Sequence, residues 1–230
     1  MKTVAWIYRL HRWAGWLVGA QVLAWVLGGV LFAWLPFDGW VKAGDVVRPP
    51  QAVLSAGWAL PAGAEALAVV ATPAGPALRV QTPGAPPQVL GTDGRPLPAP
   101  TAEAVRAFGA SLHREGAAVA DVQRLAEVPH RLGIVHELAG RGDVWRVQFA
   151  DRLGTRIYLD GASGAYLTAR TDAWVAYDLL WRLHIMDYGG GEDFNNTLLR
   201  LAALAALALT LAGVVLAVRA AWRQGRRLLS

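Results

Sequence analysis

Histidine is the residue type on which any metal or redox chemistry of this chain depends, because its 230 residues include five histidines and no cysteine. Without thiolates the chain has no ligands for an iron–sulfur cluster and no attachment point for a covalent c-type haem. Neutral imidazole remains, and it is a good ligand for haem iron. The five are His11, His113, His130, His136 and His184.

Two of these histidines flank long apolar runs. His11 precedes the run 13–35, and His184 precedes the run 201–218. Each run is long enough to cross a hydrocarbon core of about 30 Å at about 1.5 Å per residue. An ionisable side chain at membrane depth indicates function by default, but a histidine near the interface also has a plain role as a hydrogen-bonding boundary residue. For His113, His130 and His136, which lie in the middle segment away from the apolar runs, a plain structural role is the expected one.

The charges predict how these runs are oriented. We expect transmembrane helices over 13–35 and 198–218. All 17 acidic residues lie in 38–193, whereas the segments 1–12 and 219–230 carry basic residues and no acids. By the positive-inside rule both termini are cytoplasmic and the middle of the chain is periplasmic. The net charge of +5 is thus a topology signal and not a nucleic-acid signal. A cleaved signal peptide is disfavoured, because its apolar region is usually only about 7–15 residues long.

The segment between the runs contains an internal repeat. Residues 78–81 (Leu-Arg-Val-Gln) match residues 145–148 (Trp-Arg-Val-Gln). An Asp-Gly pair follows each arginine by 14 residues, at 93–94 and at 160–161. A duplication with an offset of 67 residues explains both matches.

We expect the segment 36–173 to be an α+β periplasmic domain. Its two halves, about 52–100 and about 101–170, should each combine a helix with antiparallel strands. Thr101 is a good N-cap for a helix at the start of the second half. The expected strands are 66–71, 77–82, 88–90, 119–128, 144–150, 155–159 and 165–170.

A further helix is expected over 174–188, before the second apolar run. Aromatic residues and one histidine fall on one face of it at about 100° per residue. They are Trp174, Tyr177, Trp181, His184, Ile185 and Tyr188. Trp and Tyr favour the membrane–water boundary, so this amphipathic helix is expected to lie on the outer leaflet.

Two glycines, Gly15 and Gly19, follow His11 at intervals of four residues on one helix face. Small residues at this spacing let two helix backbones approach closely. The helix face that contains Gly15 and Gly19 is either a plain contact surface for another helix or a groove in which His11 reaches a flat apolar cofactor.

Three groups of residues, at both membrane borders and in the second half of the middle segment, carry a family resemblance. They are 10–15 (LHRWAG), 145–147 with 158–161 and Gly164, and 182–188 (RLHIMDY) with 194–196. Together they resemble the PepSY-associated transmembrane proteins. The resemblance implies a periplasmic PepSY domain, and it matches His11 and His184 to the membrane-border histidines of that family. Larger relatives have more spans, are associated with iron–siderophore uptake, and include haem-containing inner-membrane reductases of ferric siderophores.

The resemblance thus implies haem b, with His11 and His184 as ligands of the iron. Bis-histidine ligation needs two imidazoles on one iron, whereas these residues lie at opposite ends of a span of about 30 Å. A two-fold homodimer solves this, because it brings each residue near its own copy and gives one haem site on each side of the membrane. A heteromeric membrane partner that supplies the missing histidines is the alternative.

The expected function is transmembrane electron transfer by a haem-dependent reductase subunit of the bacterial inner membrane. Its acceptor would be periplasmic, such as ferric iron or a ferric siderophore. No residue is identified as catalytic, and the sequence has no glycine-rich phosphate fingerprint of a nucleotide or flavin site, so electrons come from a partner or from quinol. The alternative is a non-catalytic PepSY module, tethered to the lipid bilayer, that binds or regulates a periplasmic protein.

The topology is testable with a reporter enzyme that is active only in the periplasm. Fused after Ser230, the reporter should be inactive, because the basic tail keeps this end in the cytoplasm. A fusion within the acidic middle segment is the positive control. Activity of the C-terminal fusion would show that the orientation is the reverse of the predicted one, and the predicted direction of electron flow would then also be wrong.

Overall fold

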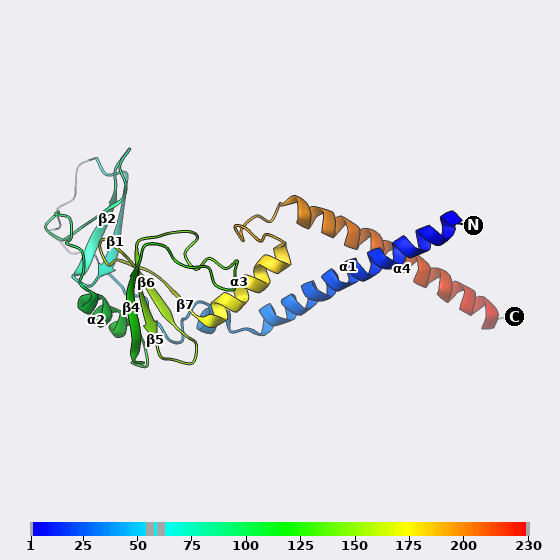
Figure 1. Cartoon of the computed structure of the whole chain (residues 1–230), viewed down its shortest axis with the longest axis horizontal. Helices are drawn as coiled ribbons and strands as arrows, with labels where there is room; N and C mark the ends of the chain where they lie inside the picture. Colours follow the sequence, from blue (N-terminus) through cyan, green and yellow to red (C-terminus); the bar gives the residue numbers. More distant parts are fainter. Residues whose placement is uncertain (1, 54–57, 59–62, 229–230) are drawn as a thin grey trace. The chain divides into compact units, whose positions relative to one another are not determined.

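The chain forms two compact units (Figure 1). The computed structural model describes residues 2–53, 58 and 63–228, with the backbone alone for residues 2–11 and for parts of 215–228. The helical unit contains Met1–Trp34 and Leu180–Ser230, and the sheet unit contains Leu35–Leu179. The fold is mixed α+β, with two antiparallel sheets and two long apolar helices.

Helices α1 (Lys2–Trp34) and α4 (Thr197–Leu228) make up most of the helical unit. Within them, Arg12–Trp34 and Thr197–Val214 are long and apolar enough to cross a membrane, judged by length and composition alone. These stretches coincide closely with the two runs that the sequence singles out. α1 ends shortly before Pro36, because the ring of a proline disfavours helical backbone in the residue that precedes it.

The first sheet is antiparallel, in the order β1-β2-β3. Its strands are β1 (Ala66–Thr72), β2 (Gly75–Gln81) and β3 (Gln88–Leu90). Arg79, the repeat arginine of the first half, lies near the centre of the sheet, opposite Ala68 on β1 and Val89 on β3. The hydrophobic core of this sheet is small, and its buried members are Leu78, Val80 and Leu90.

The second sheet is antiparallel, in the order β4-β5-β6-β7. Its strands are β4 (Val119–Leu125), β5 (Val144–Phe149), β6 (Arg156–Asp160) and β7 (Tyr166–Arg170). Arg146, the repeat arginine of the second half, lies opposite Gln123 on β4 and Tyr158 on β6. Both repeat arginines are therefore in the second strand of their sheet. The seven expected strands are confirmed, although β4 ends three residues earlier than predicted.

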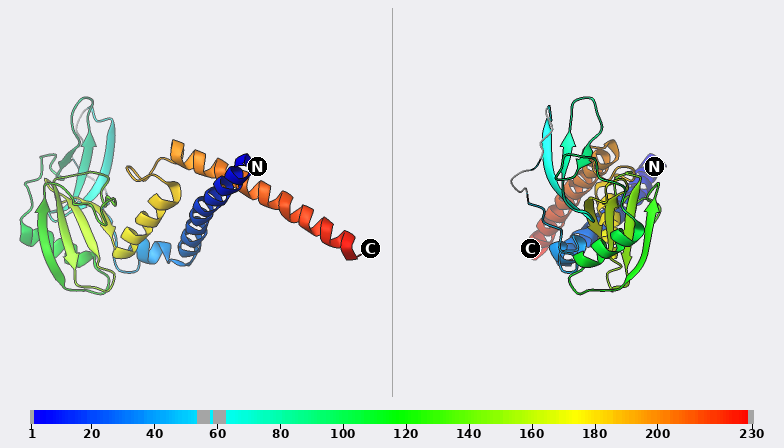
Figure 2. Two further views of the ribbon diagram at one scale, coloured as in Figure 1. Left: turned by 45° about the vertical axis from the view of Figure 1, so that its right-hand side comes forward. Right: turned by 90° about the vertical axis from the view of Figure 1, so that its left-hand side faces the viewer.

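Helix α2 (Ala102–Leu112) covers one face of the second sheet, against β4 and β5 (Figure 2). As predicted, Thr101 caps it, with the Oγ1 atom accepting a hydrogen bond from the backbone N–H of Ala104 at 3.2 Å. Its apolar side chains join the main core, because the alternating residues of β5 point toward them. The largest members of this core include Val105, Leu112, Val147, Phe149, Ile157 and Leu159.

Two expectations about helices need correction. The first half, about 52–100, was expected to combine a helix with its strands, but its described residues (52–53, 58 and 63–100) contain strands and no helix, and the five-residue π-helix Phe37–Val41 lies ahead of this half. The amphipathic helix expected over 174–188 is α3 (Asp172–Ile185), so Tyr188 lies outside it. The helix ends early because Met186 adopts a φ of +55° and the Asp187 carboxylate binds backbone N–H groups that follow it, including that of Gly189.

The approach of α2 to β5 depends on Gly109. A Cβ atom at this position would lie 2.9 Å from Cγ1 of Val147, which is too close for two carbon atoms. We expect Gly109→Leu to lower the free energy of unfolding by about 1–3 kcal/mol, because overpacking displaces the helix. Ala107→Leu, on the exposed side of α2, is the matched control and should have little effect in denaturant titrations of the intact chain. Equal stability of the two variants would contradict this packing.

Candidate functional site

His184 lies in the last turn of α3, surrounded by aromatic rings of the helical unit. Its ring centroid is 6.3 Å from that of Trp25 and 5.8 Å from that of Phe32, both on α1. The Trp181 ring, one turn earlier on α3, stacks parallel to it at 6.3 Å. A Cβ atom on Gly28 would lie 3.7 Å from Nδ1 of His184, so the small size of this glycine allows the imidazole to approach the backbone of α1.

Neither nitrogen of His184 has a hydrogen-bond partner among the described residues. Nδ1 is fully buried and unbonded, as is the neighbouring Nε1 of Trp25. Nε2 is not among the fully enclosed atoms. An unpartnered buried nitrogen costs about 1–3 kcal/mol. Such an imidazole is unusual in a purely structural role, because the interior normally satisfies its nitrogens.

His184 lies beside the candidate span and not at its end. Gly28 precedes Trp34, the last residue of that span, by six residues, which corresponds to about 9 Å along the helix. The expectation that His184 lies near the membrane boundary stays a prediction, and the structure adds that the last turns of α3 pack along α1. Sequence reasoning overlooked Gly28. The signal was its spacing, since Gly28 falls between Trp25 and Phe32 on one face of the helix.

The helical unit also contains an apolar cavity of about 390 Å³. It lies where α1 meets the start of α4, and Met186 forms part of its wall. Cavities of about 300–1,000 Å³ with mostly apolar walls are typical of sites for small ligands and cofactors. The lining residues are Leu17, Val18, Gln21, Met186, Leu198, Leu201, Ala202, Ala205 and Ala206.

The residues around His184 are of the types that hold a haem. His184 offers one imidazole, and the aromatic rings of Trp25, Phe32 and Trp181 surround it. The second predicted ligand, His11, lies in α1, but its side chain is outside the described residues. It precedes Gly28 on the same helix by 17 residues, or about 25 Å, so the two histidines of one chain do not meet. His184 is the only histidine side chain described in the helical unit.

The three remaining histidines lie in the sheet unit. His113 is buried, with Nε2 3.2 Å from the Asp151 carboxylate and Nδ1 accepting the backbone N–H of Ala117 at 3.3 Å. His130 and His136 flank a short β-bridge, and their ring centroids are 3.7 Å apart. Within the described residues, no three histidine or acidic side chains form a group that could hold a metal ion.

The carboxylate of Asp151 contacts His113 and also binds Thr155, the residue that precedes β6. It accepts hydrogen bonds from the backbone N–H of Thr155 at 2.8 Å and from its hydroxyl at 2.5 Å. Burial opposes ionisation of Asp151, but the bonds from Thr155 and His113 outweigh it and lower the pKa of Asp151. The arrangement stabilises a charged carboxylate in a partly buried place.

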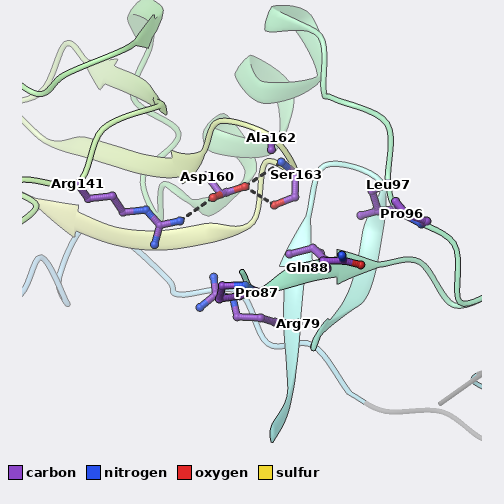
Figure 3. Close-up of a pocket in the computed structure, with 10 residues that line it drawn as sticks. Arg79, Pro87, Gln88, Pro96, Leu97, Arg141, Asp160, Ala162 and Ser163 are labelled. Carbon is purple, nitrogen blue, oxygen red and sulfur yellow. Dashed lines mark hydrogen bonds and ion pairs between the residues drawn. The ribbon is translucent and has the colours of Figure 1, made fainter. Parts of the chain in front are cut away.

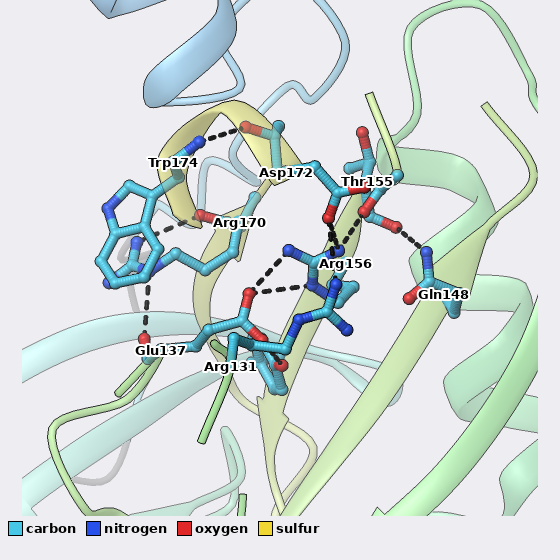
Figure 4. A network of polar contacts seen from close by, with 12 residues as sticks. Arg131, Glu137, Gln148, Thr155, Arg156, Arg170, Asp172 and Trp174 are labelled. Carbon is cyan, nitrogen blue, oxygen red and sulfur yellow. Dashed lines mark hydrogen bonds and ion pairs between the residues drawn. The ribbon is translucent and has the colours of Figure 1, made fainter. Parts of the chain in front are cut away.

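A buried ion pair joins Glu137 to Arg156, and both residues are 2% exposed (Figure 4). Nε of Arg156 donates to Oε1 of Glu137 at 2.9 Å, and the Tyr158 hydroxyl donates to Oε2 at 2.8 Å. Burial and the adjacent carboxylate raise the pKa of Tyr158, so its hydroxyl remains protonated. Arg156 also donates to Asp172, the first residue of α3, at 2.8 Å. The network therefore has a structural role: it holds the first residue of α3 against the second sheet.

A solvent-open pocket of about 490 Å³ lies between the two sheets of the sheet unit (Figure 3). Its polar side chains include Arg79 of β2, Arg141 of the loop before β5, and Asp160 and Ser163 of the turn after β6. Sequence reasoning used Arg79 and Asp160 to define the repeat, but it did not predict that they line one pocket. No signal within either half could show this, because the pocket forms only when the halves pack together.

Comparisons with known proteins leave the chain without an assigned relative. No protein-family model matches the sequence, no curated protein does, and no solved structure matches the chain.

Acid should weaken the fold through Asp151. Because its pKa in the folded chain lies below the ordinary value of 3.8, the carboxylate stabilises the fold above pH 3.8 and ceases to do so as the pH falls through the folded pKa. Thr155→Val removes the hydroxyl donor and should cost about 1–3 kcal/mol at pH 7. This difference should shrink below pH 3.8 in unfolding titrations at several pH values. A cost that is constant with pH would show that the hydroxyl does not act through the charge of Asp151.

Proposed function

We propose that the chain is a PepSY-associated membrane protein that binds haem b through His184 and transfers electrons to a periplasmic acceptor. The single observation that carries the proposal is the imidazole of His184, which lies beside an apolar candidate span with both nitrogens unpartnered among the described residues. An imidazole in such a place gains most from a ligand that supplies a metal ion and a flat apolar surface. The family resemblance adds support, because it marks the same histidine.

The residues around His184 have separate roles in this proposal. Nε2 would bind the iron, while Nδ1 lies beside the small surface of Gly28. The rings of Trp25, Phe32 and Trp181 fix the plane of the imidazole and exclude water, and burial of this kind is one of the ways a protein tunes a haem. When bound, haem supplies one-electron transfer. We propose no residue of the chain as an acid, base or nucleophile.

The second ligand is proposed to come from a second copy of the chain. An isologous dimer places each His184 near its own copy, and each His11 likewise on the cytoplasmic side. No described atom lies within 4 Å of a Cβ built on Gly15 or Gly19, so this face of α1 has room for another helix. A heteromeric partner with its own histidines is the alternative arrangement.

The proposed location is the bacterial inner membrane, with both termini in the cytoplasm and the sheet unit in the periplasm. The segregation of acidic and basic residues supports this orientation. Ferric iron or a ferric siderophore is the proposed class of acceptor, and quinol or a partner protein is the proposed donor.

A second candidate function is a non-catalytic PepSY module tethered to the membrane. It is favoured by the open pocket of the sheet unit, whose lining includes two arginines and mixed polar and apolar walls. A module of this kind would bind its target in the periplasm and would need no cofactor.

The haem proposal predicts how haem content depends on each histidine. In purified protein, His184→Ala and His11→Ala should each remove about half of the Soret absorbance, because a dimer has one site per histidine pair. His130→Ala, at an exposed position of the sheet unit, should leave the absorbance unchanged. Protein without Soret absorbance, even after expression with added haem, would favour the tethered module.

Two neighbouring glycines of α1 provide a matched test that keeps the histidine in place. Gly28→Leu should displace the imidazole and reduce haem binding, because Gly28 is buried against it. Gly29→Leu should not, because Gly29 is exposed and no described atom lies within 4 Å of a Cβ built there. Full haem content in Gly28→Leu would show that the His184 site is not the one used.

A further inference from the structure

The two repeat arginines have different surroundings, although they occupy equivalent strands. Nη2 of Arg146 donates to Oε1 of Gln123 at 3.0 Å and lies 3.5 Å from a carboxylate oxygen of Asp121, both on β4. The residue across from Arg79 on β1 is Ala68, which has no polar side chain. As a result, no group of the described residues bonds or pairs with the guanidinium of Arg79.

The half-buried side chain of Arg79 lines the pocket between the two sheets. Figure 3 shows that Arg79 and Arg141 face the same space. Pro87, Val89 and Leu97 contribute apolar side chains to its lining. The pocket thus has a cationic end and an apolar lining, which together favour a ligand with an anionic group and an apolar body.

The other charges of the pocket already neutralise each other. Nη2 of Arg141 lies 2.6 Å from Oδ2 of Asp160, and the hydroxyl and backbone N–H of Ser163 donate to Oδ1 of the same carboxylate. Although burial opposes ionisation, the bonds from Ser163 and the charge of Arg141 lower the pKa of Asp160, so this carboxylate is charged at neutral pH. Arg79 therefore leaves one uncompensated positive charge.

We propose that this pocket binds a monoanionic carboxylate that carries an apolar group, with Arg79 as the residue that pairs with the carboxylate. A guanidinium offers two parallel N–H donors that match the two oxygens of a carboxylate. A dianion such as phosphate is less favoured, because its second charge would lie near Asp160 with no free cation to compensate it. The site lies wholly within the sheet unit, so it goes beyond the proposed haem function and does not rest on it.

The same chemistry is present in a small free acid and in the carboxyl terminus of a peptide. The test uses the full chain in lipid nanodiscs and measures dissociation constants by calorimetry. The probes are benzoate, an acetylated peptide that ends in leucine with a free carboxyl terminus, the amide forms of both, and inorganic phosphate. We expect at least one carboxylate to bind, and its amide to bind at least about tenfold more weakly, since charged hydrogen bonds contribute about 1.5–3 kcal/mol each.

The two arginines supply a matched pair of variants. Arg79→Gln should weaken carboxylate binding by about tenfold or more, because it removes the one uncompensated charge among the described residues that line the pocket. Arg146→Gln changes the equivalent residue of the other half and should leave the affinity unchanged, since Arg146 already has partners on β4. Circular dichroism and thermal unfolding should show that both variants remain folded.

Each outcome decides the proposal. Binding of benzoate alone identifies a small acid as the ligand, and binding of the peptide alone identifies a carboxyl terminus, and either result supports the site. Absence of binding by both carboxylates overturns it, as does tighter binding of phosphate or an equal loss of affinity in Arg146→Gln. A folded Arg79→Gln variant with unchanged affinity would also overturn the assignment.

Discussion

The buried carboxylate of Glu137 is the group on which the sheet unit most depends. It lies in the long connection between β4 and β5, and it compensates the buried charge of Arg156 on β6. Removing one partner of a buried ion pair leaves an isolated charge in a medium that solvates it poorly, which costs about 3–5 kcal/mol. Arg170 of β7 donates to the backbone carbonyl of Glu137 at 3.0 Å, so Glu137 is also bonded to the last strand of the sheet.

The network around Glu137 and Arg156 extends to the start of α3, the helix that has residues in both units. Arg156 pairs with Asp172, and Arg170 packs over the ring of Trp174 at 4.3 Å from its centroid. The hydroxyl of Thr171 links the same point to the backbone of Trp40 at 2.7 Å. α3 thus begins at this network in the sheet unit, and its last turn, which carries His184, belongs to the helical unit.

The sequence predicts local structure well because local structure follows from spacing. The strand 88–90 and the cap at Thr101 need only neighbouring residues to be recognised. The burial of Glu137 could not be predicted in this way, because its partner lies 19 residues further along the chain. The surroundings of His184 depend on how α3 packs along α1, and its approach to Gly28 arises only from that packing. The predicted role of His184 remains a proposal, and the side chain of His11 is not described.

The two sheets carry unequal shares of the core. The first has three buried core residues around Leu78, whereas the second shares a larger core with α2 and contains the ion pair of Glu137. The repeat in the sequence predicts that the two halves arose by duplication. In a duplicated domain, the copy that supplies most of the folding free energy is constrained, and the other is freer to accumulate substitutions. Evolutionary change in this domain should therefore concentrate in the first half. New binding specificities would arise there at little risk to stability, while the second half preserves the fold for both.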